Sequence, residues 1–253
     1  ILPTIRLNSL TLTSFLLSVS YSMTSISSSR GIFILFEGID RCGKSTQVKL
    51  LTDNLNLNGN RTEAIRFPNR ESNIGQLINS YLSSSSNLND QTIHLLFSAN
   101  RWESSKDIEN KLNSGINLVC DRYAYSGVAF TSAKGLDFDW CMNCDIGLPA
   151  PDCIIYFDMP VENATKRGNY GDERYEKLEF QRIVQQQFLA LKKHDEDLKQ
   201  SGQYNDETEP PLWAIINAEK SIEEIQNEVY NIVTDVVQRV SNKPVRSLWK
   251  RSL

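Results

Sequence analysis

Short, continuous apolar runs alternate along the chain with helical segments from residue 31 onward. Apolar runs without a polar residue at every second position predict strands that are buried on both faces. They occupy residues 32–36, 64–67, 116–120, 153–157 and 213–216. The predicted helices fill the gaps, at residues 44–57, 74–82, 90–113, 175–199 and 222–240. This order predicts an α/β fold with a five-stranded parallel sheet, helices on both faces, and ligands at the carboxyl ends of the strands.

Residues 1–30 differ in composition from the rest of the chain. Thirteen of them are Ser or Thr, two are Arg, and the first acidic residue of the chain is Glu37. This composition is typical of an organellar transit peptide, which would place the protein in the mitochondrion or another organelle. Met23 lies just before the predicted fold, so the stretch is equally consistent with a translated leader on a cytoplasmic protein. In both interpretations residues 31–253 form the folded domain.

Composition and charge narrow the class of protein. The net charge is −4, with 40% hydrophobic and 23% charged residues, which is typical of a globular domain and argues against a broad nonspecific grip on nucleic acid. The chain has no apolar run near the roughly 20 residues that cross a bilayer. We therefore expect neither nucleic acid nor a membrane as a partner.

The five cysteines favour a reducing compartment, because their number is odd. Cys141 and Cys144 form a C-x-x-C, but the chain has only two histidines and no second pair of this kind. Because a structural zinc ion needs four ligands, we expect thiols here and no zinc.

A phosphate-binding motif follows the first predicted strand. Residues 38–45 read G-x-x-x-x-G-K-S, and the predicted helix begins within the motif. Glycines let the backbone N–H groups point at phosphate oxygens, and the helix adds the positive end of its dipole. Lys44 supplies a charge for the β- and γ-phosphates, and the Ser45 hydroxyl can bind Mg²⁺. The motif predicts the three-layer P-loop NTPase fold and a bound nucleotide, but it leaves the reaction open.

Arg41 lies inside this loop and has two interpretations. Its guanidinium can stabilise the charge of a phosphoryl group during transfer, as an arginine finger does. The alternative is a loop arginine that points to solvent.

Other candidate residues follow the third predicted strand and lie in the long predicted helix. Asp121 ends that strand and can hold Mg²⁺ through water, while Arg122 can bridge two phosphates. Phe97 and Arg101 are four residues apart, so they share one helical face on which a planar base could stack and meet a guanidinium. Helical spacing alone favours core packing for Phe97.

Several segments together resemble the thymidylate kinase family. They are residues 36–41, which lead into the P-loop, residues 66–68 with Arg70, residues 94–103, and residues 121–130. The resemblance extends from about residue 31 to the C-terminal region. It implies an ATP-dependent kinase that phosphorylates dTMP to dTDP for dTTP synthesis, uses Mg²⁺ and forms a homodimer.

The resemblance also implies a role for each matching residue, and it favours base stacking for Phe97. The catalytic residues would be Arg41, Lys44, Asp121 and Arg122, with Ser45 and Asp121 at the metal. The ATP-binding residues would be Gly38, Arg41, Cys42, Gly43, Lys44, Ser45, Thr46 and, beside adenine, Arg167. The dTMP-binding residues would be Asp40 at the 3′-hydroxyl, Arg70 and Arg122 at the phosphate, Phe97, Arg101 and Ser126 at the base, Tyr123 near the sugar, and Phe67, Phe130 and Tyr175.

The mobile lid of the family matches residues 167–176. Gly168 and Gly171 would allow the lid to close and exclude water from the reaction. Arg41 is typical of the members whose catalytic arginine lies in the P-loop. Whether Arg174 also contributes stays open at this point.

Two other functions remain as alternatives. A deoxynucleoside kinase shares the P-loop but must activate a neutral hydroxyl with a general base, and Arg70 at the acceptor phosphate argues against it. A non-catalytic ATP-binding module would not need Arg41, Lys44 and Asp121 together.

Overall fold

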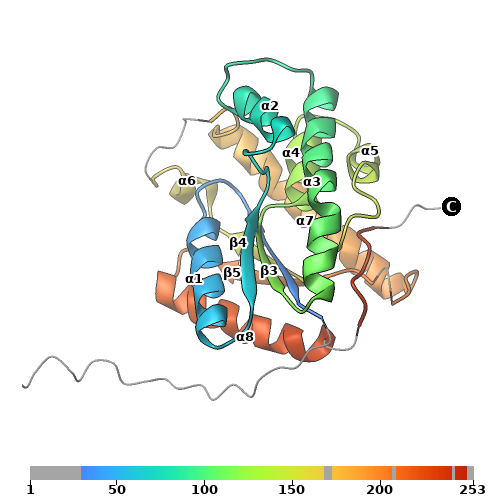
Figure 1. Cartoon of the computed structure of the whole chain (residues 1–253). Helices are drawn as coiled ribbons and strands as arrows, with labels where there is room; N and C mark the ends of the chain where they lie inside the picture. Colours follow the sequence, from blue (N-terminus) through green and yellow to red (C-terminus); the bar gives the residue numbers. More distant parts are fainter. Residues whose placement is uncertain (1–29, 168–172, 207–208, 241–242, 250–253) are drawn as a thin grey trace, which may run out of the picture.

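The computed structural model describes residues 30–167, 173–206, 209–240 and 243–249. Its centre is a parallel sheet with the strand order β2-β3-β1-β4-β5 (Figure 1). The strands are β1 (Phe33–Gly38), β2 (Thr62–Arg66), β3 (Asn117–Asp121), β4 (Cys153–Asp158) and β5 (Leu212–Asn217). Each predicted strand is present within two residues of its expected bounds, and the predicted fold class is confirmed.

Helices cover both faces of this sheet (Figure 1). On one face lie α1 (Lys44–Leu57) and α8 (Ile222–Val240). On the other face lie α3 (Asp90–Asn113), α4 (Ala124–Ser132) and α7 (Leu178–Ser201). The remaining helices are α2 (Asn73–Leu82), which packs on α3, and the short α5 (Phe138–Asn143) and α6 (Val161–Ala164).

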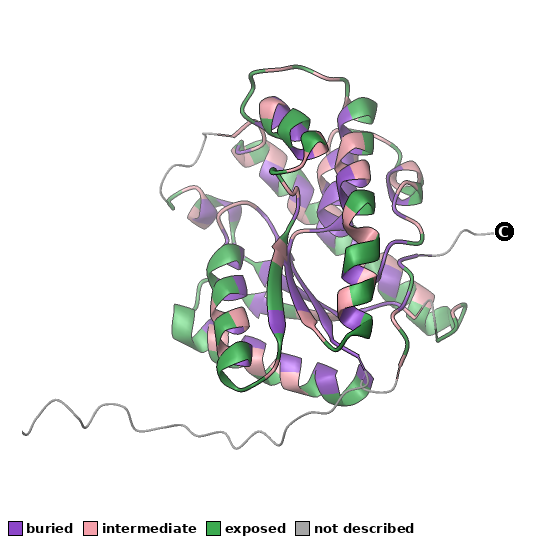
Figure 2. Cartoon of the chain, viewed as in Figure 1, coloured by how far each residue is buried: buried purple, intermediate pink, exposed green. Residues whose placement is uncertain are grey.

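Strand β1 is the centre of both hydrophobic cores. Successive side chains of a strand point to opposite faces, so Ile34 and Phe36 pack in the cluster that contains α1 and α8. Phe33 and Leu35 pack in the cluster that contains α3, α4 and α7. All six residues of β1 are buried, as the purple strands in Figure 2 show. A strand covered on both faces has no polar side, which explains the apolar run at residues 33–36.

The strand register determines which loops meet at the carboxyl end of the sheet. Phe36 of β1 pairs with Asp121 at the end of β3, and Arg66 at the end of β2 pairs with the same Asp121. The loop that follows β1 and the residues that follow β3 therefore leave the sheet side by side.

Three helices were not predicted, and one begins later than predicted. Helix α4 is buried almost all round, so it lacks the polar face that makes a helix recognisable in a sequence. Helices α5 and α6 have 6 and 4 residues, too few for a period to be visible. Helix α7 begins at Leu178 rather than at Tyr175, whose ring stacks on Phe180 with 5.4 Å between centroids.

Arg30, the last residue of the predicted leader, packs against the folded domain. Arg30 is 5% exposed and donates to both carboxylate oxygens of Asp152, at 2.9 and 2.7 Å. Asp152 also accepts from the Phe33 backbone N–H, and Arg246 lies 3.5 Å from it. The predicted leader, residues 1–30, otherwise lies outside the described residues. Among the helices of the described part, none has both the length and the apolar character to cross a membrane.

We expect Asp152→Asn to lower the free energy of unfolding by about 3 to 5 kcal/mol, because it removes the buried carboxylate that binds two nitrogens of Arg30. Urea denaturation of the purified chain measures this. The matched control is Asp53→Asn, which removes an exposed pair with Lys49 and should change stability by less than about 1 kcal/mol. Equal stability of the two variants would contradict a buried charge pair at Asp152.

Candidate active site

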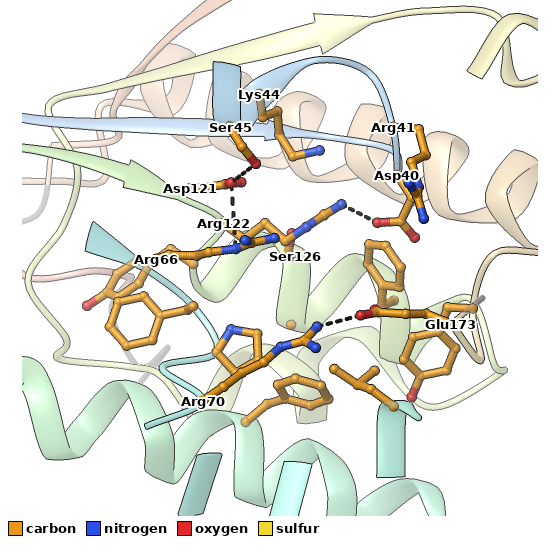
Figure 3. Close-up of a pocket in the computed structure, with 18 of the residues that line it drawn as sticks. Asp40, Arg41, Lys44, Ser45, Arg66, Arg70, Asp121, Arg122, Ser126 and Glu173 are labelled. Carbon is orange, nitrogen blue, oxygen red and sulfur yellow. Dashed lines mark hydrogen bonds and ion pairs between the residues drawn. The ribbon is translucent and has the colours of Figure 1, made fainter. Parts of the chain in front are cut away.

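A cavity of about 600 Å³ opens at the carboxyl ends of β1, β2 and β3 (Figure 3). The loop after β1, helices α3 and α4 and the segment before α7 complete its wall. The predicted site residues on this wall are Asp40, Arg41, Gly43, Lys44, Ser45, Thr46, Phe67, Arg70, Phe97, Arg101, Asp121, Arg122, Tyr123, Ser126, Phe130, Arg167 and Tyr175. Two predicted residues, Gly38 and Cys42, do not line it. Cys42 is 1% exposed, and its side chain packs in the hydrophobic core.

The P-loop has the backbone conformation that its glycines predict. Gly38 and Gly43 have φ angles of 144° and 101°, and Arg41 also has a positive φ, 64°. A Cβ on Gly38 would lie 2.8 Å from the carbonyl oxygen of Phe157 on β4, so only glycine fits there. Helix α1 begins at Lys44, and its first backbone N–H groups therefore face the cavity as an anion site.

Lys44 is folded back on the loop. Its ammonium donates to the carbonyl oxygens of Gly38 and Ile39, at 3.2 and 2.7 Å, and the residue is 5% exposed. These carbonyls hold the Lys44 ammonium at the base of the P-loop, where Lys44 forms part of the cavity wall. Phosphate oxygens would replace them as stronger acceptors.

Arg41 lies on the cavity wall, so the structure does not place it as a free solvent-facing residue. Its Nε donates to Oε1 of Glu176 at 2.7 Å, and an Nη donates to Oε2 at 3.3 Å. Glu176 stands just before α7. The pair thus joins the P-loop to the last residue of the predicted lid.

Ser45 and Asp121 form an oxygen-rich pair beside the P-loop. The Ser45 hydroxyl donates to Oδ2 of Asp121, while Oδ1 is buried and has no hydrogen-bond partner among the described residues. The Nε of Arg66 lies 3.8 Å from Oδ2 of the same carboxylate. An unpartnered carboxylate oxygen beside a hydroxyl fits a hard cation such as Mg²⁺, which prefers oxygen ligands.

Arg122 is the cation at the centre of the cavity (Figure 3). It donates to the carbonyl oxygen of Gly38 and to the Ser126 hydroxyl, both at 3.0 Å, and it pairs with Asp40. Its guanidinium also lies over the Phe130 ring, 5.2 Å from the centroid. Burial opposes the charge of Arg122, but the nearby carboxylates of Asp40, Glu37 and Asp121 outweigh it and raise the pKa further.

A buried carboxylate, Glu37, supports this arrangement. It has no exposed surface and accepts from the backbone N–H groups of Tyr123 and Ser126, at 3.0 Å each, and from the Ser126 hydroxyl at 2.6 Å. Burial raises the pKa of Glu37, while Arg122 and these hydrogen bonds act against the rise. Glu37 therefore ties the end of β1 to the first turn of α4.

The far end of the cavity is aromatic and holds a buried arginine. Phe97 lines the cavity and also packs against the cluster formed by α2 and α3. Its position is therefore compatible both with core packing and with contact to a ligand in the cavity. Arg101 is 2% exposed and bound to Asp145. Tyr123 is 1% exposed, and its hydroxyl has no hydrogen-bond partner in the described part of the chain.

Comparison with known proteins identifies the family. The family model for thymidylate kinase matches residues 36–229. Thymidylate kinases of Dictyostelium discoideum and Homo sapiens are 48% and 42% identical to the chain, over 87% of it and over 92% and 98% of their own lengths. A solved thymidylate kinase of Candida albicans superposes with a TM-score of 0.74 and 35% identity, over 87% of this chain and 99% of that one.

The chain belongs to the thymidylate kinase family. The predictions of family, fold and enzyme class are thereby confirmed: the chain is an ATP-dependent nucleoside monophosphate kinase. Within the thymidylate kinase fold, the cavity lies between the P-loop and the aromatic pocket of α3 and α4.

The predicted lid of this kinase, residues 167–176, is described only at its two ends. Arg167 donates to the carbonyl oxygens of Arg41 and Ala218, at 3.2 and 3.1 Å. Residues 168–172, with both lid glycines, lie outside the described residues. At the other end Glu173 pairs with Arg70 at 2.7 Å.

Arg174 is bound away from the P-loop. Its Nε donates to the carbonyl oxygen of Tyr81 at 2.8 Å, and an Nη donates to that of Ser86 at 2.9 Å. The guanidinium lies over the Tyr81 ring, 4.1 Å from the centroid. In this conformation it caps the end of α2 and adds no charge to the phosphate end of the cavity.

Sequence reasoning gave no role to four residues that hold this site together. Glu37 stands inside a motif that carries the resemblance, and Glu176 is the last residue of the predicted lid. Glu37 could have been recognised in the sequence, because it is a charged residue next to the apolar run of β1. Two further residues carried no such signal, because only the fold brings them to the residues that line the cavity. Gln181 donates to Asp40 at 2.6 Å, and Asp145 accepts from Arg101.

We expect Glu37→Gln to lower kcat/KM for the kinase reaction roughly tenfold or more, because the amide keeps one acceptor oxygen for donors that now bind two, and it removes the negative charge beside Arg122. A coupled assay of ADP release measures this. Glu63→Gln, on an exposed part of β2, serves as the control and should retain the wild-type rate. A folded Glu37→Gln enzyme with unchanged kinetics would refute the supporting role.

Proposed function

We propose that the cavity aligns ATP and dTMP end to end and transfers the γ-phosphoryl group of ATP to dTMP. The products are ADP and dTDP, and the reaction serves dTTP synthesis. The observation that carries this proposal is the convergence of Arg41, Lys44, Arg70 and Arg122 on one cavity. The P-loop closes one end of that cavity, and an aromatic pocket closes the other.

ATP occupies the P-loop end. The N–H groups at the start of α1 and the Lys44 ammonium bind the β- and γ-phosphates, and Arg167 lies where the adenine would enter. Gly38 and Cys42 contribute by shaping the backbone of the loop, because neither residue lines the cavity.

dTMP occupies the aromatic end. Arg70 and Arg122 bind its phosphate, Phe97 stacks on the base and Arg101 donates to a base carbonyl. Asp40 takes the 3′-hydroxyl, and Gln181 holds the Asp40 side chain in place. Phe67, Tyr123, Ser126, Phe130 and Tyr175 complete the pocket.

Ser45 and Asp121 would hold Mg²⁺, which fits the unpartnered Oδ1 of Asp121. When bound, the ion neutralises charge on the phosphates of the nucleotide. This assignment rests on the oxygen atoms of these two side chains.

Transfer of the phosphoryl group needs alignment of the substrates and charge neutralisation more than it needs a general base. The attacking oxygen belongs to a phosphate that is already an anion at neutral pH, so no residue has to remove a proton. Arg122 lies between the two phosphate sites, and Arg41 lies at the P-loop. Together with Lys44 they stabilise the charge that develops on the moving phosphoryl group.

We also propose a homodimer. Apolar side chains on α2 and α3 support it: Leu77, Leu95 and Trp102 are 56%, 49% and 41% exposed. An apolar surface of this kind is typical of a protein interface. Helices beside the sheet would then form the contact between subunits.

The decisive assay offers dTMP and thymidine separately with ATP and Mg²⁺ and follows ADP release. We expect turnover of dTMP and at least about 100-fold lower kcat/KM for thymidine, because thymidine brings no phosphate to Arg70 and Arg122. A preference for thymidine would indicate a deoxynucleoside kinase. ATP binding without formation of dTDP would indicate a non-catalytic module.

Arg122→Ala should lower kcat at least about 100-fold with little loss of fold, because one of the positioned cations at the transferred group is removed. Steady-state kinetics and circular dichroism measure the two effects. The control is Arg61→Ala, at an exposed position outside the cavity, which should keep the wild-type rate. Wild-type turnover in the Arg122 variant would exclude its catalytic role.

A further inference from the structure

Arg101 is held by an ion pair that is buried on both sides. Its Nε donates to Oδ1 of Asp145 at 3.1 Å, and Nη2 donates to Oδ2 at 2.6 Å. The two side chains are 2% and 0% exposed. A fork of two parallel hydrogen bonds fixes the plane of a guanidinium as well as its position.

The guanidinium also lies against Gly127 of α4. A Cβ at this position would lie 2.7 Å from Nη2 and 3.0 Å from Nη1, so a larger residue would displace the guanidinium. Arg101 is therefore fixed between the Asp145 carboxylate and the backbone of α4. Its Nη1 makes no hydrogen bond to any described residue, and Arg101 lines the cavity.

The segment that carries Asp145 is itself fastened to one face of α3. His94 and Ser98 bind the carbonyl oxygens of Cys141 and Cys144, at 3.0 and 2.9 Å. The Trp102 indole N–H donates to the same Cys144 carbonyl at 2.8 Å. His94, Ser98, Arg101 and Trp102 follow helical spacing, so they share one face of α3. The C-x-x-C thus belongs to a structural segment. Among the described residues, no three or more His, Cys, Asp and Glu side chains are grouped as the ligands of a metal ion.

We propose that Asp145 is a positioning residue that selects the nucleobase by fixing the guanidinium of Arg101. This inference rests on the proposed function, in which dTMP fills the aromatic end of the cavity. With Nε and one N–H of Nη2 committed to Asp145, Nη1 is the nitrogen whose two N–H groups are both left for the substrate. These donors bind a base that presents an acceptor, such as a carbonyl oxygen, at the facing position.

This arrangement separates thymine from cytosine. A cytosine amino group is a donor in the position where thymine has a carbonyl, so it would place two donors face to face. The Asp145 charge also neutralises Arg101, which keeps this cation from competing with Arg70 and Arg122 for the dTMP phosphate.

The first test is Asp145→Asn, assayed with dTMP and with dCMP at a temperature where the variant is folded. We expect KM for dTMP to rise roughly tenfold or more, kcat at saturating dTMP to stay within about threefold of wild type, and KM for ATP to stay unchanged. The ratio of kcat/KM for dTMP to that for dCMP should fall about tenfold. An unchanged KM for dTMP or an unchanged ratio would overturn the inference.

Asp152→Asn is the matched control, because it also removes a carboxylate from a buried arginine pair. It lies outside the cavity and should leave KM for dTMP within about twofold of wild type. A similar rise of KM in both variants would mean that general destabilisation, and not the position of Arg101, is the cause.

A second comparison uses variants without the Arg101 side chain, whose charge Asp145→Asn leaves unpaired. It stays informative if Asp145→Asn does not fold. Arg101→Ala and the double variant Arg101→Ala/Asp145→Ala should have the same KM for dTMP within about twofold, because Asp145 acts only through Arg101. A further rise of about tenfold in the double variant would contradict this.

The activity of the wild-type enzyme separates a failure of the proposed function from a failure of this inference. Wild-type enzyme that does not phosphorylate dTMP would contradict the proposed function and this inference with it. Wild-type enzyme that does so, with unaltered base selection in Asp145→Asn, would contradict this inference alone.

Discussion

The register between β1 and β3 is the constraint on which the site depends. Because Phe36 pairs with Asp121, the P-loop and Arg122 leave the sheet at the same level. Glu37 then joins the end of β1 to the first turn of α4 through three hydrogen bonds. A shift of one residue in this pairing would turn Glu37 and Asp121 toward the opposite faces of the sheet. The distance between the donor and acceptor ends of the cavity is thus set by backbone pairing, and the side chains refine it.

Carboxylates balance the cations of the cavity in two different ways. The pairs Arg41–Glu176, Arg70–Glu173 and Arg122–Asp40 all have at least one partly exposed member. Phosphate oxygens can therefore replace these carboxylates when the nucleotides bind. The pair Arg101–Asp145 is buried on both sides. In the proposed binding mode this pair stays closed, so the phosphate ends of the substrates would meet exchangeable partners while the base would meet a fixed one.

Sequence predicts this fold well wherever a local pattern reflects burial. The central strands appear as apolar runs because helices cover both faces, and the P-loop appears as a motif because its turn requires glycine. Helix α4 was not predicted from the sequence, because burial on nearly all sides removes the amphipathic period. Asp145 did not appear either, because its role depends on the packing of α3 against a segment 44 residues away. The family resemblance supplied most of the cavity residues, whereas Glu37, Gln181 and Asp145 required the packed structure.

A crystal structure with dTMP and a non-hydrolysable ATP analogue tests the central claim most directly. The account predicts the analogue's phosphates on the P-loop and the thymine ring on Phe97. It also predicts the dTMP phosphate between Arg70 and Arg122, in line with the terminal phosphate of the analogue. A dTMP phosphate that points away from the P-loop, or an empty aromatic pocket, would contradict it.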